Sequence, residues 1–158
     1  MTINLENYTR TDNPDGSVTF TPVKVSKRFV PKMRGEYFYV PSFGGIEDCT
    51  WKDNDYDKGR LAMGNIYRTR EEAGKARDKQ LALVRIQNYI ADNELGKEFV
   101  KWESNYSITY HHNKKVFDWF NWDSHDQYNP ISYLKSVEAC TQVIENCKED
   151  LLIVWGRK

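Results

Sequence analysis

Long apolar runs are absent from this sequence. Its mean hydropathy is −0.77, and no uninterrupted apolar stretch approaches the roughly 20 residues that a helix needs to cross a bilayer. The first residues, Met1–Glu6, also lack the basic start and the apolar core of a secretory signal peptide. We therefore expect a soluble, cytoplasmic protein.

Cysteine is scarce. The chain has three cysteines and no CxxC pair, which argues against a disulfide framework or a structural zinc site. Cys140 and Cys147 are seven residues apart, so on a helix they share a face with Val143 and Ile144. Free cysteine usually packs as a small apolar residue, so we expect buried thiols there.

An excess of charge of either sign is also missing, because 23 basic side chains balance 23 acidic ones. The chain as a whole therefore favours neither nucleic acid nor its mimics. The local distribution is uneven: residues 36–57 carry one basic and six acidic side chains, and residues 58–87 carry eight basic and three acidic. The two segments can pair with each other or face different partners.

Catalytic motifs are missing as well. The sequence has no glycine-rich phosphate loop, nucleophile elbow or HExxH helix. His111, His112 and His125 have no carboxylate or cysteine at ligand spacing. We therefore predict no catalytic residue, no metal and no cofactor.

The acidic segment Asp53–Gly59 looks like part of a calcium loop. An EF-hand needs Gly at the sixth position and Glu at the twelfth, where this chain has Lys58 and Gly64. We predict instead an exposed acidic loop that can mimic phosphate and bind a partner. The predicted acidic contact residues are Glu47, Asp48, Asp53, Asp55 and Asp57.

Residues 1–34 read as an N-terminal arm with a β-hairpin. Asp12–Gly16 is a strong turn signal. Val18–Thr21 and Val23–Val25 alternate as strands do, and Pro22 between them favours an edge strand or a bulge.

Residues 35–93 form the first predicted hairpin-plus-helix unit. Glu36–Val40 and Ile46–Trp51 make a hairpin, and residues 60–67 are expected to be extended. Thr69 and Glu72 then form a capping box that starts a helix. The periodicity predicts one buried stripe on that helix, made of Ala73, Ala76, Gln80, Leu83 or Val84, Gln87 and Ile90.

Residues 94–158 form the second predicted unit. The pattern predicts a helix over Glu94–Glu103, then a hairpin, then an extended Ile131–Leu134, and a helix capped by Ser136. The hairpin consists of Tyr106–Tyr110 and Val116–Phe120 joined by a turn at residues 111–114. The segment Leu151–Trp155 fits either a helix continuation or a closing strand.

The expected fold class is α+β, with antiparallel strands packed by helices. Residues 36–90 and 106–150 share the order of hairpin, extended segment and Thr- or Ser-capped helix. We interpret this order as an internal duplication. The alternative is that a hairpin followed by a helix is simply a common unit.

These residues resemble a group of small proteins encoded by bacteriophages and prophages of Gram-positive bacteria. The resemblance rests on Gly35–Tyr39, on Trp51, on Arg60 with Gly64–Ala73, and on Leu134–Ala139 near the end of the chain. It covers residues 35–90 well and 106–155 loosely, and residues 1–34 lie outside it. The resemblance implies a phage accessory protein that acts on host machinery, for example as an anti-CRISPR inhibitor.

Two further surfaces are candidates for binding. The predicted first helix and its approach carry six cations that could contact phosphates, namely Arg68, Arg70, Lys75, Arg77, Lys79 and Arg85. In the second hairpin, alternation places Phe117 and Trp119 on one strand face and Phe120 on the other. With Trp122 and Tyr128 nearby, we expect a partly exposed aromatic surface around Trp119 and Trp122.

The preferred hypothesis is a non-enzymatic phage protein, acting in the cytoplasm of the infected bacterium. It would bind and inhibit a host defence protein, with a CRISPR effector nuclease as the leading target. One alternative is a nucleic-acid-binding accessory protein of phage replication or recombination. Another is a protein that sequesters a nucleotide signal in a pocket across an oligomer interface. The sequence leaves open whether the protein forms a homodimer.

Overall fold

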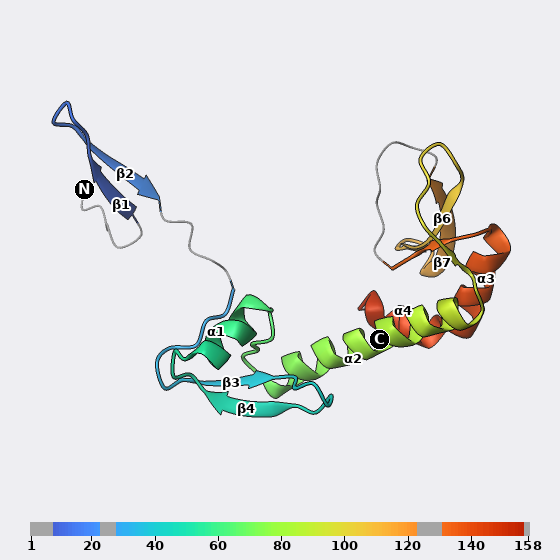
Figure 1. Cartoon of the computed structure of the whole chain (residues 1–158), viewed down its shortest axis with the longest axis horizontal. Helices are drawn as coiled ribbons and strands as arrows, with labels where there is room; N and C mark the ends of the chain where they lie inside the picture. The colour runs from blue at the N-terminus through green and yellow to red at the C-terminus, as the bar shows by residue number, and fades with distance from the viewer. Residues whose placement is uncertain (1–7, 23–27, 123–130, 157–158) are drawn as a thin grey trace.

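The fold class is α+β, as predicted, in a computed structural model that describes residues 8–22, 28–122 and 131–156. Across these ranges the strands form two separate hairpins and one larger sheet, and the helices pack on them (Figure 1). Every strand pair in the described part of the chain is antiparallel.

The first unit is built on a hairpin of strands β3 (Glu36–Tyr39) and β4 (Glu47–Thr50). It lies where the sequence predicted it. Gly44 closes the turn with a φ of 81°, and its amide donates to the carbonyl of Pro41 at 2.9 Å. Side chains with a Cβ rarely adopt that φ, so glycine allows the tight turn.

The stretch after this hairpin differs from the prediction. Residues 60–67 were expected to be extended, but helix α1 (Asp55–Ala62) takes up the first part of that range. Asn54 caps the helix, and Asp57 closes a capping box with it. Only Tyr67 pairs with β3 within residues 60–67. The capping box and the acidic first turn stabilise the helix start and outweigh the weak extended pattern.

Helix α2 (Arg70–Asp92) begins at the predicted capping box of Thr69 and Glu72. Its 23 residues span roughly 35 Å at 1.5 Å per residue. The helix runs from the first unit to the second and connects them (Figure 1). Its polar composition is unlike that of a membrane span, and none of the helices in the described ranges is both long and apolar enough to cross a bilayer.

The predicted single buried stripe of α2 is wrong, because the helix buries opposite faces at its two ends. Ala73 is buried where the start of the helix meets β3, whereas Ala82, Ile86 and Ile90 are buried further along. Ala73 and Ala82 are nine residues apart, which is about two and a half turns. Gln87, which the stripe placed inside, is exposed. Two packing partners on opposite sides cannot produce one stripe.

The second unit contains the larger sheet, ordered β5-β8-β6-β7. Its long central hairpin joins β6 (Asn105–His111) to β7 (Val116–Trp122), as predicted. The short strands β5 (Gly96–Lys97) and β8 (Tyr133–Leu134) extend the sheet beside β6. Strand β7 therefore forms one edge of the sheet.

Two helices pack on this sheet and on α2. Helix α3 (Val137–Asn146) starts at the predicted Ser136 cap, and α4 (Lys148–Val154) shows that the segment from Leu151 to Val154 is helical. Cys140 and Cys147 are buried, and burial raises the pKa of the Cys140 thiol to about 11. The core consists of Ile86, Ile90, Ile108, Leu134, Ala139, Cys140, Val143, Cys147 and Leu151.

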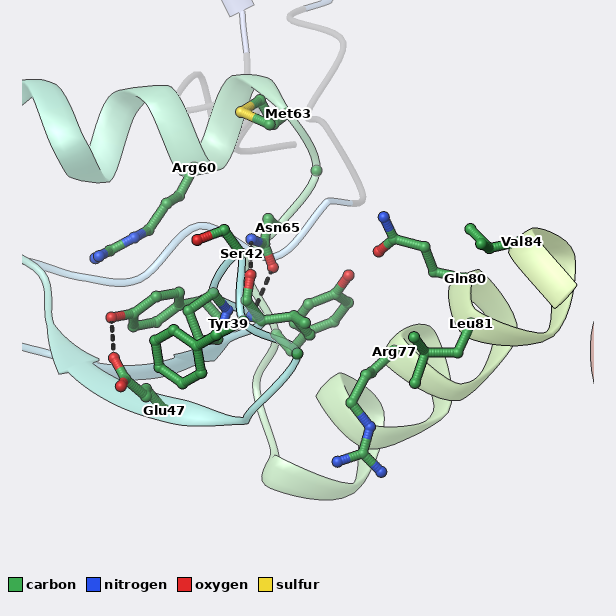
Figure 2. Close-up of a pocket in the computed structure, with 16 residues that line it drawn as sticks. Tyr39, Ser42, Glu47, Arg60, Met63, Asn65, Arg77, Gln80, Leu81 and Val84 are labelled. Carbon is green, nitrogen blue, oxygen red and sulfur yellow. Dashed lines mark hydrogen bonds between the residues drawn. The ribbon is translucent and has the colours of Figure 1, made fainter. Parts of the chain in front are cut away.

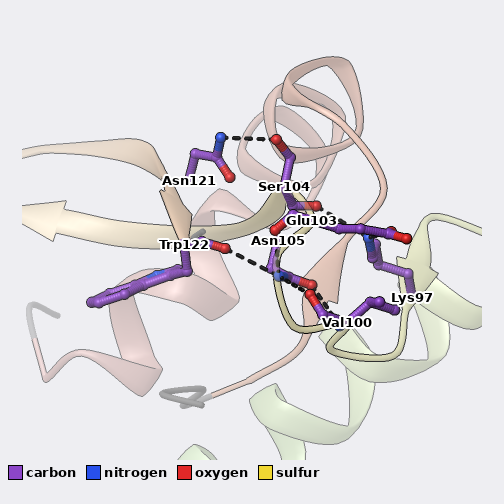
Figure 3. A network of polar contacts seen from close by, with 7 residues as sticks. All are labelled: Lys97, Val100, Glu103, Ser104, Asn105, Asn121 and Trp122. Atoms are coloured by element: carbon purple, nitrogen blue, oxygen red, sulfur yellow. Dashed lines mark hydrogen bonds and ion pairs between the residues drawn. The ribbon is translucent and has the colours of Figure 1, made fainter. Parts of the chain in front are cut away.

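The predicted helix over residues 94–103 is absent, and β5 with a turn takes its place. Glu94 has a φ of 51°, which ends the helical path after α2. Further along, the side chain of the buried Asn105 bonds the main chain of Val100 twice (Figure 3). Its Oδ1 accepts from the Val100 N–H at 2.9 Å, and its Nδ2 donates to the Val100 carbonyl at 2.8 Å. Asn105 also donates to the carbonyl of Trp122 at 3.1 Å, so one side chain joins the turn to β7.

The two units share one detail of strand pairing. Phe38 of β3 pairs with Tyr67, and Tyr106 of β6 pairs with Leu134. Tyr67 and Leu134 each lie two residues before the N-cap of the helix that follows. This common arrangement agrees with the duplication, which stays an interpretation.

Near the N-terminus, β1 (Tyr8–Asp12) and β2 (Val18–Pro22) form a separate hairpin. The Asp12–Gly16 turn signal lies at its tip, as the sequence indicates, and the hairpin stands apart from the two units in Figure 1. The strand predicted at Val23–Val25 lies outside the described residues.

Candidate functional site

The predicted acidic contact residues do not form an uncompensated negative surface. Four of them are exposed, namely Glu47, Asp48, Asp53 and Asp55. Asp48 lies 3.2 Å from the guanidinium of Arg70, and Asp53 lies 3.7 Å from the ammonium of Lys58. Glu47 accepts a hydrogen bond from the hydroxyl of Tyr39. Nearby cations therefore offset the charge of Asp48 and Asp53, two of these four exposed carboxylates.

Asp57 does not belong to the exposed set, which corrects the prediction that it contacts a partner. Its side chain is 1% exposed. It accepts from the Tyr37 hydroxyl at 2.6 Å and from the Lys52 amide at 2.7 Å. Burial alone would raise the pKa of this carboxyl, but these hydrogen bonds and the charge of Arg60 outweigh it and hold the pKa below its ordinary value.

Asp57 anchors a network that orients Arg60. The Nη1 group of Arg60 donates to the Tyr37 hydroxyl at 2.7 Å, while that hydroxyl donates to Asp57. The guanidinium also lies 3.6 Å from the centroid of the Tyr39 ring. Burial, together with the hydrogen bond to Asp57, raises the pKa of Tyr37. These contacts fix a cation in place on a tyrosine ring.

An open groove of about 660 Å³ lies beside this fixed cation (Figure 2). One wall is the β3–β4 turn, residues 39–44, together with Glu47. A second wall is the end of α1 with the turn that follows, and the third is the face of α2 between Arg77 and Val84. Three segments that are separate in sequence thus surround one space.

Asn65 holds two of these walls together. Its Oδ1 accepts from the Val40 amide at 2.8 Å, and its Nδ2 donates to the Val40 carbonyl at 2.7 Å (Figure 2). The preceding Gly64 has a φ of 77°, which lets the chain turn sharply after α1. Two hydrogen bonds from the Asn65 side chain to the main chain of Val40 therefore fix the position of the α1 wall.

The groove gathers large apolar side chains that are open to solvent. Phe43 is 75% exposed and Met63 is 83% exposed. On the α2 wall, Leu81 and Val84 are 43% and 44% exposed. All four line the groove, although they come from three segments. Exposed apolar side chains that gather in one place commonly mark a binding surface.

Sequence reasoning missed this groove. One signal was available: Leu81 lies four residues after Arg77 and three before Val84, so these residues share a helix face. Another was Phe43, a large ring at a turn position between Ser42 and Gly44. Nothing in the sequence indicated that these two places would meet.

The six predicted cations do not form one basic face. At about 100° per residue, Lys75 and Lys79 lie on the opposite side of α2 from Arg77. Arg68 precedes the helix and lies 5.1 Å from the Phe29 ring centroid. Four of the cations form ion pairs, Arg70 with Asp48, Lys75 with Glu71, Arg77 with Asp78, and Arg85 with Asp150. Arg77 is the one of the six that lines the groove.

Trp119 and Trp122 lie on opposite faces of β7, because they are three residues apart on a strand. Trp119 packs edge-on against Tyr106 at 6.0 Å and is 41% exposed. The Trp122 ring packs at a tilt against Phe120, with 4.6 Å between the ring centroids, and its Nε1 donates to the Ser107 hydroxyl at 2.8 Å. The two tryptophans therefore do not share one surface, and Tyr128 lies outside the described residues.

The histidines give no indication of a metal. His111 ends β6, and His112 packs edge-on against the ring of Tyr110 at 5.4 Å. His125 lies outside the described residues. Within residues 8–22, 28–122 and 131–156, no three His, Cys, Asp or Glu side chains gather closely enough to hold a metal ion.

No protein-family model, curated protein or solved structure matches this chain. The resemblance to phage proteins therefore rests on its residues alone, Gly35–Tyr39, Trp51, Arg60, Gly64–Ala73 and Leu134–Ala139.

Proposed function

We propose that this protein is a non-enzymatic binding protein and that it holds a segment of another protein in its groove. The observation that carries this proposal is the meeting of Phe43, Met63, Leu81 and Val84, all exposed, in one hollow. Flexible methionine side chains adapt to a partner's shape. Aromatic side chains are frequent at the energetic centre of protein interfaces.

The free energies of apolar burial and of ion pairing favour the groove over the charged surfaces as the source of affinity. Burial of one large apolar side chain contributes about 1.5–3 kcal/mol. An exposed ion pair contributes about 0–1 kcal/mol, and most of the predicted acidic and basic residues are already paired within the chain. The charged residues are therefore better suited to steering a partner than to holding it.

The target we propose is a host defence protein, with a CRISPR effector nuclease first. This choice is supported by the resemblance of Gly35–Tyr39 and Gly64–Ala73 to phage proteins of Gram-positive bacteria. On this proposal the protein is made in the infected bacterium and blocks the nuclease by occupying one of its surfaces. The mechanism requires no catalytic residue.

A plasmid-interference assay tests both parts of the proposal. The protein is expressed in bacteria with an active CRISPR nuclease, and transformation by a targeted plasmid is measured. We expect the wild type to restore transformation, and the double variant Met63→Ser with Leu81→Ser to fail. Met33→Ser is the matched control, because Met33 is 63% exposed but lies outside the groove, and it should behave as the wild type.

The two ways of failing are distinct in this assay. If the wild type restores nothing, the CRISPR target is excluded. If the double variant restores transformation as well as the wild type does, the groove is not the inhibitory surface. Circular dichroism of each purified variant shows whether it is folded.

A further inference from the structure

We infer that the segment held in the groove is acidic, with one large apolar side chain flanked by carboxylates. This inference rests on the proposed function. Among the described residues that line the groove, the cations are Arg60 and Arg77 and the one carboxylate is Glu47. The two guanidinium groups come from different walls of the groove, α1 and α2 (Figure 2).

Arg60 is prepared to receive a carboxylate. Its guanidinium is held by the Tyr37 hydroxyl at 2.7 Å and by the Tyr39 ring at 3.6 Å. A guanidinium has five N–H donors in a fixed fork and binds carboxylates in a bidentate manner. Since the side chain is already ordered, binding costs little additional side-chain entropy. The buried Asp57 contributes by fixing Tyr37.

Arg77 supplies the second cation from the α2 wall. It contacts Asp78, the next residue on the same helix, at 2.7 Å. Asp78 is about half exposed, and an ion pair in that setting contributes little. A partner carboxylate can therefore share or replace Asp78 at small cost.

Glu47 offsets only part of this positive character, because one carboxylate stands against two guanidinium groups among the described lining residues. Its carboxylate accepts from the Tyr39 hydroxyl, and this hydrogen bond raises the pKa of Tyr39. It stands at one end of the groove, beside Tyr39 (Figure 2). The aliphatic side chains of Met63, Leu81 and Val84 suit the apolar side chain of a peptide better than the charged phosphate backbone of a nucleic acid.

An unbiased peptide selection tests the inference. The immobilised full-length protein is offered displayed random peptides of about twelve residues, enough to cross the groove in extended form. The ionic strength is ~150 mM, so that only close charge pairs contribute. We expect the enriched peptides to combine an aromatic or aliphatic residue with at least two nearby Asp or Glu residues.

Variants then locate the contact by fluorescence anisotropy with the best peptides. We expect Arg77→Gln and Arg60→Gln each to weaken binding about tenfold, the size of one charge-assisted hydrogen bond. The matched control Lys114→Gln removes a cation from the exposed β6–β7 turn, and it should change the Kd less than about twofold. Arg77 lies on a helix surface, so its variant keeps the test valid even if Arg60→Gln does not fold.

The outcomes separate this inference from the proposed function. Enriched peptides that lack acidic residues, yet lose binding with Met63→Ser, would overturn the acidic partner and leave the groove as a protein-binding site. Peptides that bind wild type and Met63→Ser equally, or no enrichment at all, would remove the groove and the inference together.

Discussion

At the scale of single residues, Asp57 joins local and tertiary structure in the first unit. It closes the capping box at the start of α1 and accepts the hydrogen bond of Tyr37. A buried carboxylate without partners is costly, and here several donors satisfy it. The hydroxyl of Tyr37 in turn holds Arg60, so a helix cap and a groove cation depend on the same side chain.

Replacing Asp57 by Asn tests this role. We expect the free energy of unfolding at pH 7 to fall by about 2 kcal/mol, because hydrogen bonds to a charged group are lost. Urea denaturation measures this loss. Asp55→Asn is the matched control in the same helical turn, where only the interaction with the helix dipole is removed, at about 0.3–1 kcal/mol.

The pH dependence of the Asp57→Asn effect has a definite sign. The folded pKa of Asp57 lies below its ordinary value of 3.8. A carboxyl of this kind stabilises the fold fully above its unfolded pKa, and the contribution is lost as the pH falls through the folded pKa. The difference between wild type and variant should therefore shrink below pH 3.8. A difference that is the same at pH 7 and in acid would contradict the assignment.

At the scale of elements, α2 packs against two different partners on opposite sides of one helix. Its start packs against the first hairpin, and its second half packs against α3 and α4 on the opposite side. Leu81 and Val84 lie toward the same side of the helix as Ala73 but further along, and these line the groove. Without the first hairpin they would lie on an ordinary outer face.

Paired substitutions on α2 distinguish this arrangement from a single stripe. Ala82→Leu should lower the free energy of unfolding by about 1–3 kcal/mol, because Ala82 is fully buried and has no room for a larger side chain. Gln87→Leu should change it by no more than about 0.5 kcal/mol, because Gln87 is exposed. Thermal or urea unfolding measures both variants, and the reverse order would restore the single stripe.

The elements differ in how well the sequence predicts them, for physical reasons. The caps at Thr69 and Ser136 are local hydrogen-bond motifs, and both helices start where predicted. The apolar spacing in residues 94–103 is compatible with a helix. However, the Asn105 side chain forms hydrogen bonds with the main chain of Val100, and these bonds favour a turn. The same side chain is also held by the carbonyl of Trp122 on the neighbouring strand, a distant contact that local periodicity does not contain.

At the scale of the whole molecule, the net charge is zero and opposite charges are paired along the surface. We therefore expect no binding of a labelled single- or double-stranded oligonucleotide at about 10 µM protein in ~50 mM salt. Fluorescence anisotropy makes the measurement. Binding that falls by orders of magnitude between ~50 and ~200 mM salt would revive the nucleic-acid hypothesis.

The sequence by itself determined the α+β class, both main hairpins and the caps of α2 and α3. Each of these depends on alternation, turn residues or hydrogen bonds between residues a few positions apart. It also predicted that Phe117 and Phe120 would face opposite sides of their strand, which follows from the two-residue period.

Tertiary structure alone decided the groove and the place of Asp57. Phe43, Met63 and Leu81 are brought together by the packing of a turn, a short helix and a long helix. Asp57 looks like its acidic neighbours in sequence, yet it is buried and accepts a hydrogen bond from Tyr37, which lies 20 residues earlier in the chain. Burial and proximity between distant segments arise from packing, so no local pattern in the chain contains them.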